Sequence, residues 1–290
     1  MLEKHPLQAL FSATHMSTDG RVIAKRPGAE FGEAGGGETL WAEMVKHYIM
    51  ELGLVVQGDL WPALEIVRLE HRIQEGDFLS IARLSPIVPP GRERLIAKAL
   101  FAGYDNDFVT AIHILVPQLE HLVRFHLKQV GESLFLRKLV LGIQAQASGK
   151  YLTRPFMPTA PPDGVDYRGL TTLTSLSMAV SAGVTTTTLD PKGIENENGL
   201  STLMEHRQAN EIFGEDLAFE IRALFCDPFG PNLRNELAHG LIDLEEAQSV
   251  PSIYAWWLLL KITFNTFWQT KQRGKGHASE DTEAKQPISE

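Results

Sequence analysis

Residues 106–130, with the sequence NDFVTAIHILVPQLEHLVRFHLKQV, decide the fold class of this chain. Their apolar side chains recur at the three- and four-residue spacing of a single helix face, as Phe108, Ile112, Leu115, Leu119, Leu122 and Phe125. We expect Pro117, in the middle of this pattern, to kink or break the helix because it removes a backbone donor. The segment is the longest helical pattern in the chain, and few segments alternate with a period of two. The sequence therefore predicts a mainly α fold.

Further helical patterns lie on both sides of this segment. They cover residues 39–55, 60–73, 78–84 and 92–101 on the N-terminal side and residues 200–204, 215–225, 233–242 and 253–268 on the C-terminal side. Pro62 falls in a first helical turn, where proline is tolerated. Asp19-Gly20 stands between two short apolar runs and predicts a hairpin turn.

These patterns divide the chain into an N-terminal arm with a Gly-rich linker, a helical extension, a helical-bundle domain and a disordered polar tail, at residues 1–38, 39–89, 90–270 and 271–290. The boundary at 89/90 falls in a proline-rich connector. Residues 131–183 are rich in Ser, Thr and Pro and interrupt the bundle. We interpret them as an insertion, because connections of this length are uncommon inside a compact domain.

Charge and cysteine content exclude several classes of protein. The chain has 290 residues, with 27 Lys and Arg against 36 Asp and Glu, which gives a net charge of −9. So acidic a chain is not a general polyanion binder, and a nucleic-acid site on it must be local. Cys226 is the only cysteine, which excludes an intrachain disulfide and a thiolate metal cluster.

The sequence does not predict export or membrane insertion. Residues 1–6 lack the basic-then-apolar plan of a secretory signal, and the strongest apolar run, residues 253–268, is shorter than the roughly 20 residues that a membrane span needs. We therefore expect a cytoplasmic protein without a membrane span. Because that run is apolar nearly all round, it predicts either a central core helix or a dimer seam.

Common catalytic motifs are missing from the sequence, including the glycine patterns of nucleotide-binding loops, the nucleophile elbow and the zinc-binding His pair. His113, His121 and His126 share one helical segment, but their spacings of eight and five are not metal-ligand spacings. We expect no metal ion and no cofactor.

Residues 227–240, with the sequence DPFGPNLRNELAHG, begin with a helix-start signal. Asn232 is a good N-cap residue. Leu233, Leu237 and Leu241 are spaced by four and predict the buried stripe of the helix that follows it.

Three polar residues of this helix point away from the leucine stripe. At about 100° per residue, Arg234, Asn235 and His239 lie at roughly 100°, 200° and 240° from Leu233. The sequence thus predicts one face that carries a cation, an amide and an imidazole. The first turn of a helix also favours an anion.

These residue types suit phosphodiester chemistry. Arginine can hold a phosphate through two bonds, histidine can take or give a proton near neutral pH, and asparagine can donate to an oxyanion. In RNA the adjacent 2′-OH is the nucleophile, so no metal ion is required. One histidine per chain does not supply both an acid and a base, but a symmetric dimer would. The alternative is that Arg234, Asn235 and His239 only bond to neighbouring loops.

The Arg234-Asn235-x-x-x-His239-Gly240 sequence resembles the signature of a domain family of unknown function that includes the endoplasmic reticulum membrane-associated RNA degradation protein. It is also similar to the wider HEPN pattern, an Arg and a His separated by four to six residues. Residues 88–93, 117–124, 187–193 and 232–241 resemble further blocks of that family.

The resemblance implies a HEPN-like helical bundle, often dimeric, with an N-terminal helical extension in this chain. Many HEPN proteins are metal-independent endoribonucleases that leave a 2′,3′-cyclic phosphate, and several act as toxins or in phage defence. By match, Arg234, Asn235 and His239 take the catalytic positions, and RNA is the implied substrate. The insertion at 131–183 departs from the family pattern. A partner protein that silences the activity is also compatible with the resemblance.

Three hypotheses follow. The first is an RNA endonuclease, whose activity survives EDTA and is lost in His239→Ala. The second is a non-catalytic HEPN-type module that binds a nucleotide, RNA or a protein, which the acidic charge favours. The third is a purely structural helical protein, in which the same substitutions only impair folding.

Overall fold

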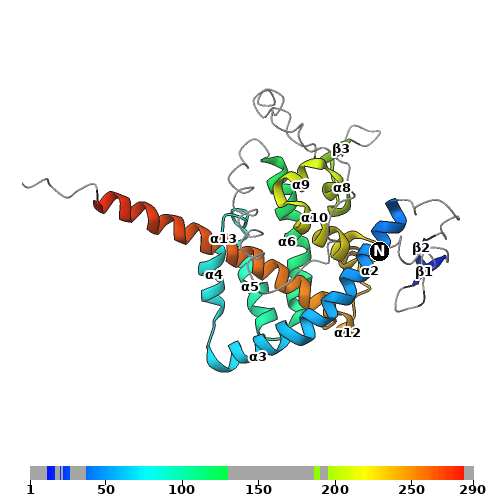
Figure 1. Ribbon diagram of the computed structural model, residues 1–290, viewed down its shortest axis with the longest axis horizontal. Helices are drawn as coiled ribbons and strands as arrows, with labels where there is room; N and C mark the ends of the chain where they lie inside the picture. The colour runs from blue at the N-terminus through cyan, green and yellow to red at the C-terminus, as the bar shows by residue number, and fades with distance from the viewer. Residues whose placement is uncertain are drawn as a thin grey trace, which may run out of the picture.

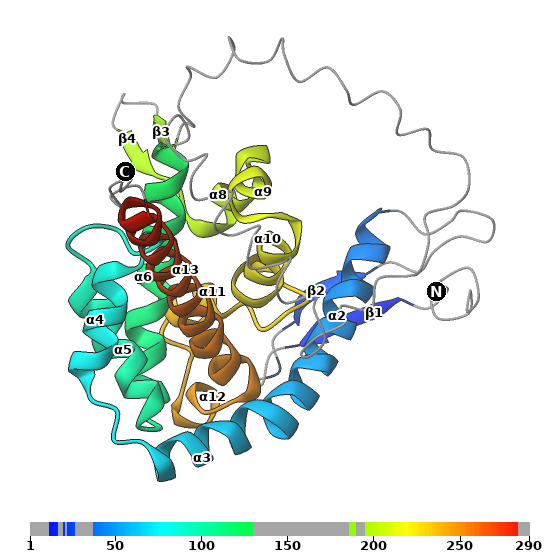
Figure 2. The same ribbon diagram turned by 60° about the vertical axis from the view of Figure 1, so that its left-hand side comes forward.

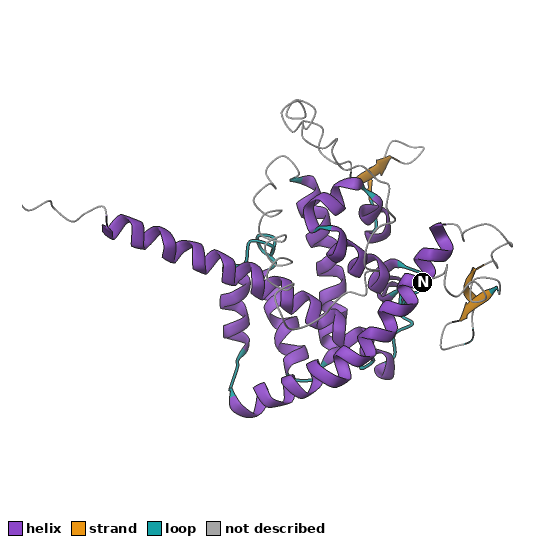
Figure 3. Cartoon of the chain, in the orientation of Figure 1, coloured by secondary structure: helices purple, strands orange, loops and turns teal. Residues whose placement is uncertain are grey.

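The computed structural model describes residues 12–16, 20, 22–26, 37–129, 186–189 and 195–283. The predicted insertion at 131–183 lies outside these residues, as does most of the Gly-rich linker. Among the described residues the chain is mainly helical, as the sequence predicts, and its strands form two small hairpins (Figure 3).

The longer helices are α2 (Gly37–Val55), α3 (Trp61–Glu70), α4 (Glu75–Leu84), α5 (Glu93–Tyr104), α6 (Phe108–Lys128) and α13 (Val250–Glu283). The shorter ones are α8 (Leu200–Glu205), α9 (Arg207–Phe213), α10 (Glu215–Ile221), α11 (Leu233–Ala238) and α12 (Leu244–Ala247), with π-helical turns η1 (Val56–Leu60) and η3 (Arg222–Cys226). The strands pair antiparallel, β1 (Ala13–Met16) with β2 (Val22–Arg26) and β3 (Thr187–Leu189) with β4 (Glu195–Glu197). The β1–β2 pair confirms the hairpin predicted around Gly20.

Helix α6 runs through the middle of the bundle and is covered by neighbouring helices (Figures 1 and 2). Its predicted apolar stripe is buried from Phe108 to Leu122, and Phe125 is half-buried. Pro117 does not break the helix, which corrects one of the two outcomes expected from the sequence. A proline inside a helix costs about 3 kcal/mol, whereas each large apolar side chain buried along this stripe contributes about 1.5–3 kcal/mol. The stripe therefore outweighs the proline.

The helical extension predicted for residues 39–89 is not separate from the bundle. Helices α4 and α5 pack directly on each other across the connector at 85–91, and Ile87 and Val88 within it are buried. One continuous hydrophobic core reaches from Leu52 on α2 to Ile262 on α13. The predicted boundary at 89/90 is therefore a turn inside one core. The reason is that Ile87 and Val88 of the proline-rich connector are apolar enough to be buried.

The first half of α13 is a core helix, one of the two interpretations that the sequence left open. Tyr254, Trp256 and Leu258 are buried there. The indole of Trp256 lies against Gly103 on α5, where an added Cβ would come within 2.3 Å of the ring. Further along α13, Phe264 and Trp268 are exposed, and the helix projects beyond the bundle (Figure 1).

The polar tail predicted to be disordered from residue 271 is helical as far as Glu283, because α13 continues through it. Helix propagation explains the difference, since each residue added to an existing helix gains a hydrogen bond without a new nucleation cost. Residues 284–290 lie outside the described part of the chain.

His126 on α6 is a buried titratable group. Its ring is 1% exposed, packs edge-on against Phe125 and Phe213, and donates from Nε2 to the carbonyl oxygen of Ile87 over 2.9 Å. Burial lowers the pKa of this imidazole below its ordinary value, against the opposing effect of the bond to Ile87. The folded protein therefore favours the neutral form of this ring more than the unfolded chain does.

We expect acid to destabilise the fold partly through His126. The unfolded imidazole takes up a proton as the pH falls through about 6.5, whereas the folded ring does so only at lower pH. The contribution to stability is thus full above about pH 6.5 and is lost below it. His126→Gln keeps a donor near the Nε2 position and should flatten the fall in melting temperature from about pH 7 to pH 5. The same slope as in the exposed-residue control His113→Gln would contradict this assignment.

Candidate functional site

The helix that carries the Arg-Asn-x-x-x-His signature is short. Helix α11 begins at Leu233, directly after Asn232, whose backbone is left-handed with φ of 51°. Asn232 takes the N-cap position, as the sequence predicts, but its side chain does not form the capping hydrogen bond. Its Oδ1 instead accepts a hydrogen bond from Nδ2 of Asn235 over 2.8 Å. Asparagine tolerates the left-handed conformation, so Asn232 can form the tight turn from which α11 begins.

Gly240 of the signature ends α11. With φ of +68° it donates its N–H to Leu237 O over 3.0 Å, and the next residue, Leu241, donates to Glu236 O over 2.9 Å. These two bonds are a Schellman motif, in which glycine takes the left-handed position after the helix. The predicted leucine stripe therefore stops early, since Leu233 is buried but Leu241 is 37% exposed.

Arg234 is the best-anchored residue of the signature. Its Nε donates to Oε2 of Glu120 on α6 over 2.9 Å, and its Nη1 donates to Oδ1 of Asn235 over 3.1 Å. Gly199 leaves room for the guanidinium, because a Cβ at that position would lie 3.2 Å from Nη2. The side chain is 31% exposed. Arg234 and Asn235 are thus brought together, as the sequence predicts.

Glu120 and Arg124 lie on α6, the helix that faces Arg234. Oε1 of Glu120 accepts from Nη2 of Arg124 over 2.8 Å, so one carboxylate bridges two arginines. Arg124 Nη2 also donates to the carbonyl oxygen of Asn198 over 2.7 Å, and Arg124 pairs with Glu197 on β4. Glu120 and Arg124 are four residues apart on α6, the spacing at which opposite charges on one helix can pair.

His239 lies apart from this cluster. It is the C-cap residue of α11 and is exposed, and no other described residue forms a hydrogen bond with its ring. Its backbone N–H donates to the carbonyl oxygen of Asn235 over 3.0 Å, but among the described residues no hydrogen bond joins its ring to the side chain of Arg234 or Asn235. The predicted single polar face is therefore divided into an anchored Arg-Asn pair and an exposed imidazole at the end of the same helix.

Cys226 lies behind the cluster, at the end of η3. Burial raises the pKa of its thiol to about 11, and the nearby Glu120 also raises it while Arg234 lowers it. The group is therefore a neutral thiol at neutral pH and is not poised as a nucleophile.

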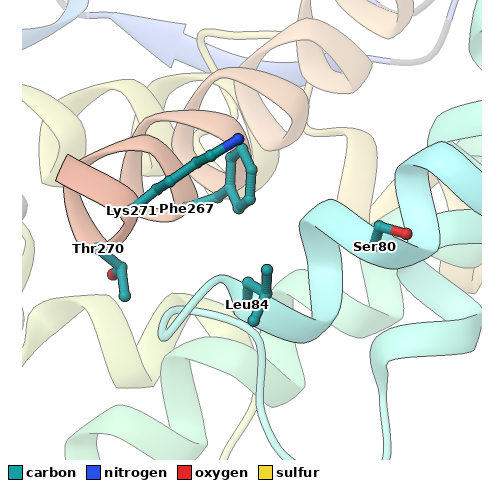
Figure 4. A pocket seen from close by; sticks show the side chains of 5 residues that line it. All are labelled: Ser80, Leu84, Phe267, Thr270 and Lys271. Carbon is teal, nitrogen blue, oxygen red and sulfur yellow. The ribbon is translucent and has the colours of Figure 1, made fainter. Parts of the chain in front are cut away.

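The described residues also form a cavity, which lies away from the Arg234 cluster. A cavity of about 450 Å³ between α4 and α13 is lined by Ser80, Leu84, Phe267, Thr270 and Lys271 (Figure 4). None of these residues belongs to the Arg234 cluster. Within the described ranges, no three His, Cys, Asp or Glu side chains are grouped so that they could hold a metal ion.

The fold and this cluster define a mainly helical protein with a charged junction between α6, α11 and the β3–β4 hairpin. Comparison with protein-family models, with curated proteins and with solved structures finds no match to the chain. In the described part of the chain, none of the helices combines the length and apolar character that crossing a membrane requires.

Proposed function

We propose that this protein is a metal-independent RNA endonuclease of the HEPN type. The observation that carries the proposal is the state of Arg234. Two of its N–H groups are used to hold it in place, and a guanidinium has five, so three remain without a hydrogen-bond acceptor among the described residues. An oriented, partly exposed cation with free donors is suited to a phosphodiester.

The reaction needs only groups of this chain and of the RNA. Arg234 holds the scissile phosphate and offsets the charge that develops on it. The RNA 2′-oxygen attacks phosphorus and gives its proton to one His239, while the bond to the 5′-oxygen breaks and that oxygen takes a proton from a second imidazole. The products are a 2′,3′-cyclic phosphate and a 5′-hydroxyl.

The second imidazole comes from a second copy of the chain. Among the described residues the ring of His239 has no hydrogen bond to Arg234, and its exposure leaves it accessible to another molecule. A homodimer that apposes two copies of α11 would place both histidines at one cleft. Light scattering tests this directly, because a protein that remains monomeric at assay concentration lacks the composite cleft.

The test of the function is incubation of an end-labelled RNA panel with the purified protein in EDTA, followed by analysis of the product ends. Cleavage that leaves cyclic phosphate supports the proposal. Cleavage that requires a divalent cation, or none by a folded protein, contradicts it. The proposed setting for such an activity is the cytoplasm.

A second candidate is a non-catalytic HEPN-type module that binds RNA or a nucleotide. The pairing of Arg234 with Glu120 favours it, because the carboxylate already offsets much of the guanidinium charge. Retention of labelled RNA without product formation, and loss of that retention in Arg234→Ala, would support this candidate.

A further inference from the structure

Glu120 is shared between two arginines that come from different parts of the chain. Arg124 lies one turn further along α6, and Arg234 is 114 residues away in sequence. Each carboxylate oxygen accepts from one of them, at 2.8 Å and 2.9 Å. The side chains of Glu120 and Arg124 are only 18% and 15% exposed. Shielding from water makes these charge-assisted bonds stronger and more directional than surface pairs.

The Glu120 carboxylate is oriented by Arg124, which has further partners of its own. Arg124 has three partners, since its Nη2 donates to Glu120 and to the carbonyl oxygen of Asn198, and its guanidinium forms an ion pair with the carboxylate of Glu197. Lys128 donates to the other oxygen of Glu197 over 3.1 Å. Arg124 is therefore fixed by α6 and the β3–β4 hairpin together, and it in turn fixes the orientation of Glu120.

The charges of this cluster do not balance. Among the described residues it contains three cations, Arg124, Lys128 and Arg234, and two carboxylates, Glu120 and Glu197. Both carboxylates pair with Arg124, whereas Arg234 has ion-pair distance only to Glu120 among the residues described. Glu197 also pairs with Lys128, so each carboxylate is shared by two cations and the cluster keeps one surplus positive charge. A purely structural ion pair does not require this surplus.

We propose that Glu120 is the positioning residue of Arg234, with Arg124 holding the opposite oxygen of the same carboxylate. Glu120 takes the Nε–H, Asn235 takes one Nη1–H, and the remaining donors are directed away from these two acceptors. The inference rests on the proposed endonuclease function, because its consequence is the orientation of the phosphate-binding group. Glu120 acts through Arg234 and does not itself contact substrate.

The test uses Glu120→Gln in the full-length chain, which keeps the shape of the side chain but replaces one acceptor oxygen by a donor. We expect kcat for RNA cleavage in EDTA to fall about 10- to 100-fold, with KM changed less than about twofold, because a misdirected guanidinium loses stabilisation of the transition state. Arg124→Lys should also lower kcat, since an ammonium cannot reproduce the planar bridge. The fall should be smaller than in Glu120→Gln, because the direct bond between Glu120 and Arg234 is retained.

The Arg207–Glu211 pair on α9 supplies matched controls. It has the same i,i+4 spacing and a 3.1 Å contact, but its side chains are 88% and 47% exposed. Glu211→Gln and Arg207→Lys repeat the chemical changes outside the cluster and are expected to leave kcat unchanged. A Glu120→Gln enzyme with the same kcat as Glu211→Gln would overturn the inference.

A second readout separates this inference from the proposed function. The Nε–H NMR signal of Arg234, assigned by its loss in Arg234→Lys, should exchange with water roughly tenfold faster in Glu120→Gln than in the parent protein. Faster exchange without any RNA cleavage by the parent would contradict the endonuclease but retain Glu120 as the group that orients Arg234. Unchanged exchange would overturn the positioning role whether or not RNA is cleaved.

Discussion

Replacing His239 by alanine is expected to reduce the rate of RNA cleavage in EDTA by about 10²- to 10⁴-fold, the range for loss of a general acid or base. The side chain is exposed and makes no hydrogen bond with any other described residue, so its removal should leave the melting temperature of the protein unchanged. The measurement is the cleavage rate of one labelled RNA, with parent and variant at equal concentrations. A large loss of rate with an unchanged fold separates a chemical role from a structural one.

His113→Ala is the matched control for this experiment. His113 is also exposed, and the one hydrogen bond of its ring among the described residues is to the carbonyl oxygen of Val109 on its own helix, over 2.8 Å. Its substitution should not change the cleavage rate. Equal rates for His239→Ala and His113→Ala would remove His239 from the mechanism. If RNA is cleaved at the same rate by the parent and by both variants, the cleavage comes from a contaminating nuclease.

Gly230→Ala is expected to lower the stability of the protein by about 3 kcal/mol, or roughly 5–10 °C in melting temperature. Gly230 is buried, and a Cβ on it would lie 2.0 Å from the backbone oxygen of Ala223 in η3 and 3.4 Å from Val45 on α2. Backbone atoms cannot move aside as a flexible side chain can, so the loop before α11 would be displaced. Thermal unfolding by circular dichroism measures the effect.

Gly53→Ala tests whether that loss is specific. Gly53 lies inside α2, and a Cβ there meets no atom within 4 Å. The same chemical change should therefore stabilise the protein by about 0.5–1 kcal/mol, the gain of alanine over glycine inside a helix. The prediction for Gly230 would be wrong if both variants melted at the same temperature.

The elements with a regular apolar period could be predicted from the sequence. The spacing of apolar residues from Phe108 to Leu122 predicts α6, and Asp19-Gly20 predicts the first hairpin. Proline was a less reliable signal where the burial of neighbouring apolar residues opposes its effect on the backbone. Pro117 is tolerated because the burial around it outweighs a missing hydrogen bond, and residues 87–89 of the connector are buried although the segment looks like a boundary.

The candidate site could be predicted only in part. The adjacent residues Arg234 and Asn235 lie together as expected, because their contact depends on local helix geometry. The bond from Arg234 to Glu120 joins α11 to α6 across 114 residues, and periodicity cannot indicate such a contact. The division between Arg234 and His239 follows from the early end of α11 at Gly240. A glycine after a short polar helix was the available signal for that end.

The shortness of α11 links ligand binding to local opening. A helix of six residues is not stable by itself in water, so α11 persists because Leu233 is buried and Arg234 is tied to α6. Its backbone amides should therefore exchange with deuterium through a partial opening that needs less free energy than unfolding of α6. A phosphate that binds Arg234 would slow this exchange, and one that pulls Arg234 away from Glu120 would accelerate it. Occupancy of the site can thus be followed from the amides of α11 alone.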